Sequence, residues 1–221
     1  PGSYDPDITW ETTTTYNVGV DFGFCDDRIT GNVDAYVRNT SDLLNEVITP
    51  MGANFGNKIL TNIGSMQNKG IEFSLNVVPV QTKDWHLSIG FNGTFQETKI
   101  TKLNTSDDPR YKEMVVGISK GTGSKFSFHK VGYAPYTYFP FQQVYDADGK
   151  PIQNALVDRD GDGKITELDR YESGKSPIPG FYYGLNLKLS YKNWDFGING
   201  HGNADYWIFN DFASEHSTSS V

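Results

Sequence analysis

Apolar and polar side chains alternate strictly along three pairs of neighbouring segments in this chain. The first segment sets Tyr16, Val18, Val20, Phe22 and Phe24 against Asn17, Gly19, Asp21 and Gly23. A period of two residues produces a β-strand with one apolar and one polar face, whereas a helix needs a period near 3.6. The chain is therefore predicted to be all-β and built from antiparallel hairpins.

Each pair of segments is joined by a short polar turn, which predicts hairpins at about 14–38, 70–97 and 180–204. Long polar stretches at about 39–69 and 98–179 separate the hairpins. Short turns at one end and long loops at the other are typical of outer-membrane barrels, whereas a soluble sandwich has more even spacing. The sequence thus predicts an antiparallel transmembrane β-barrel segment with long extracellular loops.

The amino-acid composition argues against several kinds of protein. The chain has 19 Lys+Arg against 27 Asp+Glu, a net charge of −8, so we expect no nucleic-acid partner. Aromatic residues make up 14% of the chain, which favours pleated sheets over helices. Cys25 is the single cysteine, so an internal disulfide framework is excluded.

Several segments, taken in order, resemble one known family. They are DPDITWETTTTYNVGVDFGFCDDRITGNVDAYVRNTSDLL, TNIGSMQNKGIEFSLN, GYAPYTYFPFQQVYDADGKPI, DRDGDGKITELDRY and SPIPGFYYGLNLKLSYKNWDFGINGHG. Together they resemble TonB-dependent receptors of the SusC/RagA branch of the Bacteroidetes, along nearly the whole chain.

The resemblance implies an outer-membrane transporter with an N-terminal plug inside a barrel of about 22 strands. Residues 1–221 would be part of the C-terminal half of that barrel domain, without the plug and the TonB box. The implied function is active import of a nutrient oligomer, either an oligosaccharide or a peptide. The implied partners are a SusD-like surface lipoprotein as lid, the TonB–ExbB–ExbD complex and the lipid of the outer membrane.

An acidic segment at residues 158–169 fits the template of a calcium-binding loop. The candidate ligands are Asp158, Asp160, Asp162, the backbone carbonyl of Lys164, and Asp169. Position 12 is Asp169 in place of the usual Glu, a shorter arm that weakens bidentate closure. We expect a structural Ca²⁺ that fixes an external loop; the alternative is a solvated turn that binds no metal.

No constellation for catalysis was found, so we expect a protein that is not an enzyme. The four histidines His86, His129, His201 and His216 show no metal-ligand spacing. Substrate-binding residues stay unassigned, although polar positions predicted to face the barrel interior lie in every hairpin: Asn17, Asp21, Asn32, Asp34, His86, Asn92, Asn186 and Asn199. Two alternatives remain open: a calcium-stabilised, glycan-binding surface adhesin, and a small self-contained outer-membrane barrel.

Overall fold

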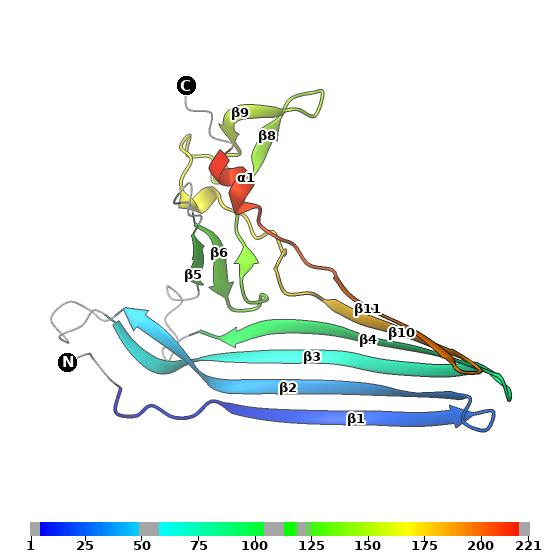
Figure 1. Ribbon diagram of the computed structural model, residues 1–221. Helices are drawn as coiled ribbons and strands as arrows, with labels where there is room; N and C mark the ends of the chain where they lie inside the picture. Colours follow the sequence, from blue (N-terminus) through cyan, green and yellow to red (C-terminus); the bar gives the residue numbers. More distant parts are fainter. Residues whose placement is uncertain (1–4, 49–57, 104–112, 119–122, 124, 217–221) are drawn as a thin grey trace.

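The computed structural model describes residues 5–48, 58–103, 113–118, 123 and 125–216. Its main element is a six-stranded antiparallel sheet in the order β1-β2-β3-β4-β10-β11. The bounds of these strands are β1 Thr12–Phe24, β2 Ile29–Ile48, β3 Lys58–Gln81, β4 Trp85–Lys102, β10 Phe181–Tyr191 and β11 Trp194–Ala204. Neighbours in the sheet follow one another along the chain except at β4 and β10, where a long insert intervenes (Figure 1).

The three predicted hairpin turns are confirmed. Strand β1 ends at Phe24 and β2 begins at Ile29, β3 and β4 are joined through residues 82–84, and β10 and β11 are joined through Lys192 and Asn193. All three turns lie at the same end of the sheet in Figure 1, and the insert rises from the other end. The structure therefore has the asymmetry of short turns and long connections that the sequence predicted.

At the end of the sheet with the long connections, the strands extend beyond their predicted limits. The stretch 39–69 was expected to be a loop, yet β2 continues to Ile48 and β3 begins at Lys58. A β-bulge interrupts the alternation, because the β2–β3 register shifts between Thr40 and Leu44, and Asp42 adopts a positive φ of 60°. These extensions mix polar residues with Leu43, Leu44, Ile63 and Met66 and do not alternate regularly, so the period of two residues did not reveal them. Residues 49–57 of the predicted loop lie outside the described residues.

The stretch 98–179 also contains ordered structure where a loop was predicted. Strand β4 continues to Lys102, and the insert holds two small sheets. Their strands are β5 Glu113–Ile118, β6 Lys125–Lys130, β7 Thr137–Tyr138, β8 Gln143–Tyr145 and β9 Pro151–Leu156, followed by the 3-10 helix η2, Glu167–Asp169. After β11 the chain returns to the insert and forms α1, Asp211–His216.

The insert is fastened to the sheet by backbone hydrogen bonds. The N–H of Ile100 in β4 donates to the carbonyl of Tyr133 at 2.9 Å, and the N–H of Gln96 donates to the carbonyl of Gly180 at 2.8 Å. The buried apolar side chains gather at this junction and inside the insert: Ile63, Ile100, Leu103, Phe128 and Phe139. The core of the described chain therefore lies where insert and sheet meet.

Candidate functional site: a two-faced wall and an acidic loop

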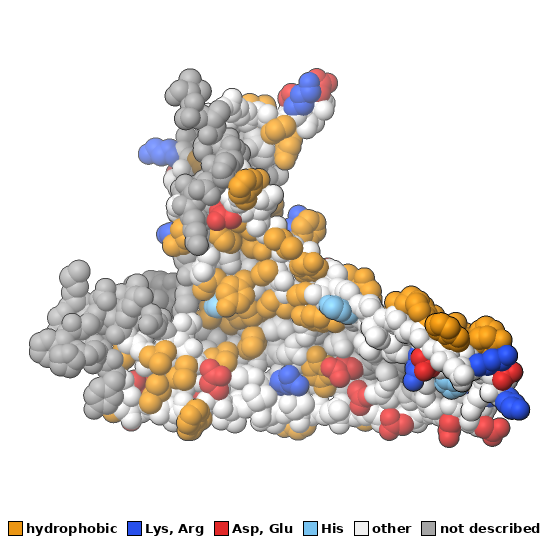
Figure 2. Space-filling model, in the orientation of Figure 1, with side chains coloured by type: hydrophobic (Ala, Val, Ile, Leu, Met, Phe, Trp, Pro, Cys, Tyr) orange, Lys and Arg blue, Asp and Glu red, His pale blue; other side chains and the backbone are white. Residues whose placement is uncertain are grey.

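One face of the six-stranded sheet is apolar across its whole width. The strand register places one such row directly side by side: Phe24, Ile29, Val77, Ile89, Leu187 and Ile198. Many side chains of this face are open to the surroundings, with Val18 71% and Phe196 56% exposed. In Figure 2, hydrophobic side chains follow the β10–β11 hairpin in the same way. A continuous exposed apolar face of this width matches contact with lipid.

Aromatic pairs bound this apolar face at two levels. At the end with the short turns, the rings of Trp85 and Tyr191 lie 4.1 Å apart, and toward the opposite end Phe95 and Phe181 stack at 4.2 Å. Ten residues separate Trp85 from Phe95 along β4. At about 3.4 Å per residue and a strand tilt near 45°, the two levels are about 24 Å apart. An apolar band about 25 Å tall, flanked by aromatic rings, is the expected dimension for an outer-membrane barrel.

The opposite face of the sheet is polar in every row of this band. One row contains Gly23, Thr30, Asn76, Gly90, Asn186 and Asn199, and the next contains Asp21, Asn32, Ser74, Asn92, Gly184 and His201. The side chains bond to one another: the hydroxyl of Ser88 donates to Asn76 Oδ1 at 3.1 Å, and the amide of Asn68 donates to Thr98 Oγ1 at 2.6 Å. All eight positions predicted to face the interior lie on this polar face.

The acidic loop brings together three of the five predicted calcium ligands. Carboxylate oxygens of Asp158, Asp160 and Asp162 lie within 4.8 Å of one another. Backbone N–H groups orient them: Gly163 donates to Asp158 Oδ2 at 2.8 Å, and Lys164 donates to Asp162 Oδ1 at 2.8 Å. A set of hard oxygen donors at this spacing fits a divalent cation such as Ca²⁺.

The negative charges of the clustered carboxylates affect the pKa of Asp160. A hydrogen bond from the backbone N–H of Asp162 lowers the pKa of Asp160, but desolvation and the charges of Asp162, Asp169 and Asp158 together raise it above its usual value. Clustered carboxylates favour protonation in this way unless a cation balances them.

Asp169, the predicted twelfth-position ligand, lies outside the cluster of three carboxylates. Its side chain is fully buried, and its two carboxylate oxygens accept hydrogen bonds from the N–H groups of Arg159 and Thr166, both at 2.6 Å. The bond from Thr166, followed by that from Arg159, holds the pKa of Asp169 below its usual range. With Thr166 it forms a capping box on η2, because the first N–H groups of a helix lack internal partners. In the structure Asp169 therefore closes the loop by bonding to backbone.

The sequence matches the profile of one family over residues 1–210, described as TonB dependent receptor-like, beta-barrel. The chain belongs to the TonB-dependent receptor β-barrel family. As a segment of such a barrel it is an outer-membrane protein, in agreement with its lipid-facing band. Among the described residues, no helix is long and apolar enough to span a bilayer.

Individual members of the TonB-dependent receptor family are similar to this chain along all or nearly all of its length. TonB-dependent receptor SusC of Bacteroides thetaiotaomicron is 43% identical over 100% of this chain, which covers 22% of that protein. TonB-dependent receptor P26 of Formosa agariphila is 30% identical over 93% of this chain and 21% of its own length. The chain thus spans about a fifth of the curated relatives that it matches.

Solved structures agree on the fold. The structure of the RagAB peptide transporter superposes with a TM-score of 0.72 at 24% identity, covering 94% of this chain and 23% of that one. The RagAB importer in its open-open state gives the same TM-score at 22% identity. The six-stranded sheet and its insert therefore have the architecture of one part of a large receptor barrel.

Proposed function

We propose that this chain forms part of the wall of an outer-membrane transporter that imports a nutrient oligomer in a TonB-dependent manner. The observation that carries the proposal is the two-faced sheet, which has an unbroken apolar row across six strands on one side and hydrogen-bonding side chains on the other. One face fits lipid and the other fits a hydrated passage. The wall binds and guides its cargo without making or breaking covalent bonds.

The proposed partners follow from the family. A SusD-like surface lipoprotein would cover the outer opening, and the TonB–ExbB–ExbD complex would supply energy from the inner membrane. The two relatives named above are TonB-dependent receptors, and the similar solved structure is of a peptide transporter. The cargo is an oligosaccharide or a peptide.

An uptake assay in the source cells tests this function. The gene for the full-length protein is deleted, and uptake of fluorescently labelled oligosaccharides and peptides is measured with and without a protonophore. We expect deletion and the protonophore to abolish uptake of the same oligomer, and the wild-type gene to restore it. Uptake that is unchanged by deletion, combined with loss of cell adhesion to glycans, would favour the surface-adhesin alternative.

The calcium site stays a second, smaller proposal. Asp158, Asp160 and Asp162 would hold Ca²⁺ between them, and the ion would fix the loop that connects β9 to η2 on the outer side. The oxygen donors fit the ion. The repulsion between carboxylates that raises the pKa of Asp160 would be relieved by a bound cation. The role would be structural.

A further inference from the structure

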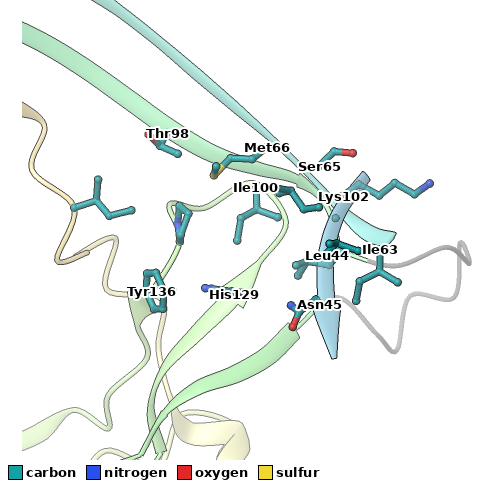
Figure 3. Close-up of a pocket in the computed structure, with 15 residues that line it drawn as sticks. Leu44, Asn45, Ile63, Ser65, Met66, Thr98, Ile100, Lys102, His129 and Tyr136 are labelled. Atoms are coloured by element: carbon teal, nitrogen blue, oxygen red, sulfur yellow. The ribbon is translucent and has the colours of Figure 1, made fainter. Parts of the chain in front are cut away.

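A pocket of about 430 Å³ lies where the outer ends of β2, β3 and β4 meet the insert. Its walls are mainly aliphatic: Leu43, Ile63, Met66, Ile100, Leu103 and Ile178. Figure 3 shows side chains from the sheet on one side and Tyr136 and His129 of the insert on the other. Volumes of this size are usual for ligand sites that are lined by apolar side chains and a few polar groups.

The pocket belongs to the inner face of the wall. Leu43, Met66 and Thr98 also line a neighbouring hollow, whose other walls include Glu72 and Thr94 of the polar face. Cargo that moves along the inner face therefore passes the mouth of the pocket. The lipid-facing side chains of the same strands point to the opposite side of the sheet.

Among the described residues that line the pocket, His129 has a buried side-chain nitrogen, Nε2, without a hydrogen-bond partner. Burial lowers the pKa of His129 below its ordinary value, so the imidazole is neutral at neutral pH. The centroids of the His129 and Tyr136 rings lie 4.7 Å apart, with the ring planes at 72°. The stem of Lys102 contributes to the lining, while its nitrogen points away from the pocket in Figure 3. A buried unpaired nitrogen costs free energy until a ligand satisfies it.

These features discriminate between the two cargo classes. Sugar hydroxyls would leave water for aliphatic walls that provide few partners, which is unfavourable. An apolar side chain gains free energy in the same place, and the adjoining peptide amide supplies a partner for Nε2.

Resting on the proposed import function, we propose that this pocket is a subsite for an apolar side chain of a peptide cargo, with His129 bonding to the adjoining peptide group. The test uses the full-length transporter with its lipoprotein partner in detergent and two acetylated, amidated hexapeptides of Gly and Ser. One peptide carries a single Phe, and the other has Ser in its place. Calorimetry measures both affinities for the wild type and for Thr98→Trp, which fills the pocket. Ile89→Trp, on the lipid-facing side of the same strand and outside the pocket, is the matched control.

The expected result is a preference of about tenfold or more for the Phe peptide, lost in Thr98→Trp and kept in Ile89→Trp. Equal binding of the two peptides, or a preference that survives Thr98→Trp, overturns the subsite. Binding and uptake of oligosaccharides alone also overturns it but leaves the import function intact. Absence of uptake of any oligomer in cells overturns both.

A second measurement covers the case in which Thr98→Trp does not fold. Met66→Cys is made together with Cys25→Ser, because Cys25 is an exposed thiol. An apolar maleimide then labels position 66, and the rate is compared with each peptide present. Protection by the Phe peptide and none by the Ser peptide supports the subsite, whereas equal rates, or no labelling at all, contradict it.

Discussion

The ring of Tyr36 lies over Gly70 on the inner face, with its hydroxyl oxygen 2.8 Å from the place where a β-carbon at residue 70 would stand. The carbonyl oxygen of Phe95 would be 2.5 Å from the same atom. The glycine thus gives a large aromatic ring room to lie flat on the wall between β2 and β4.

Gly70→Ala is therefore expected to destabilise the barrel by about 1–3 kcal/mol, because the new methyl group meets backbone that cannot move aside. Gly200→Ala is the matched control, since a β-carbon there meets nothing within 4 Å. Urea unfolding of the full-length protein in lipid vesicles, followed by tryptophan fluorescence, measures both. Equal stabilities for the two variants would show that the Tyr36 ring and the backbone at Phe95 adjust freely.

Neighbouring residues of β10 test the assignment of the two faces. Leu185 is 50% exposed on the apolar face, and Asn186 follows it on the polar face. Leu185→Arg is expected to cost about 2–4 kcal/mol of folding free energy in lipid, and Asn186→Arg much less, because only the first places a charge in hydrocarbon. The folded fraction is measured by gel electrophoresis of unheated and heated samples. A larger loss for Asn186→Arg would reverse the faces.

Calcium is expected to order the acidic loop. Asp160→Asn removes one of three clustered carboxylates and should weaken Ca²⁺ binding by tenfold or more, about 1.4 kcal/mol. Asp148→Asn, in the turn between β8 and β9, should leave it unchanged. Isothermal titration with CaCl₂ on the chelator-treated full-length protein gives the affinities. If the wild type releases no heat and binds no radioactive calcium, the loop is a solvated turn.

Acid is expected to loosen the same loop through Asp169. Hydrogen bonds from Thr166 and Arg159 lower the folded-state pKa of this carboxyl from its ordinary 3.8. Its contribution is therefore complete above about pH 4 and is lost as the pH falls through the lower folded value. Cleavage by pepsin between residues 158 and 169, compared at pH 4 and pH 2, should rise sharply at the lower pH. Asp169→Asn should already be cleaved at pH 4, and a variant as resistant as the wild type would exclude this role.

The sequence predicted what depends on residues close together along the chain. Alternation placed Val18 and Leu187 on the apolar face and Asn32 and Asn199 on the polar one, because a strand in lipid must separate the two kinds of side chain. Regular alternation ends in the outer halves of β2 and β3, so the sequence pattern does not predict these halves as strands. The bulge at Asp42 further hid their pairing.

Contacts between residues far apart in the sequence were harder to predict from the sequence. Asp169 matched a ligand position in the loop template, but only the structure shows that its oxygens are engaged by backbone N–H groups. The pocket combines Leu43 and Met66 with His129 and Ile178, which stand far apart in the sequence. Its sole local signal was the presence of apolar residues, such as Ile63 and Leu103, within otherwise polar stretches.

The insert between β4 and β10 bears on how such a barrel assembles. Phe95 and Phe181 pair across the whole insert, and joining the ends of a flexible segment costs entropy that rises with its length. Here the N–H of Ile100 bonds to the carbonyl of Tyr133, and the N–H of Tyr138 bonds to the carbonyl of Lys175, so contacts of the folded insert bring its two ends close together. An insert that folds first leaves only a short segment to be closed when β10 meets β4. With that order of folding, we expect the long insertion to slow the assembly of the sheet much less than its length implies.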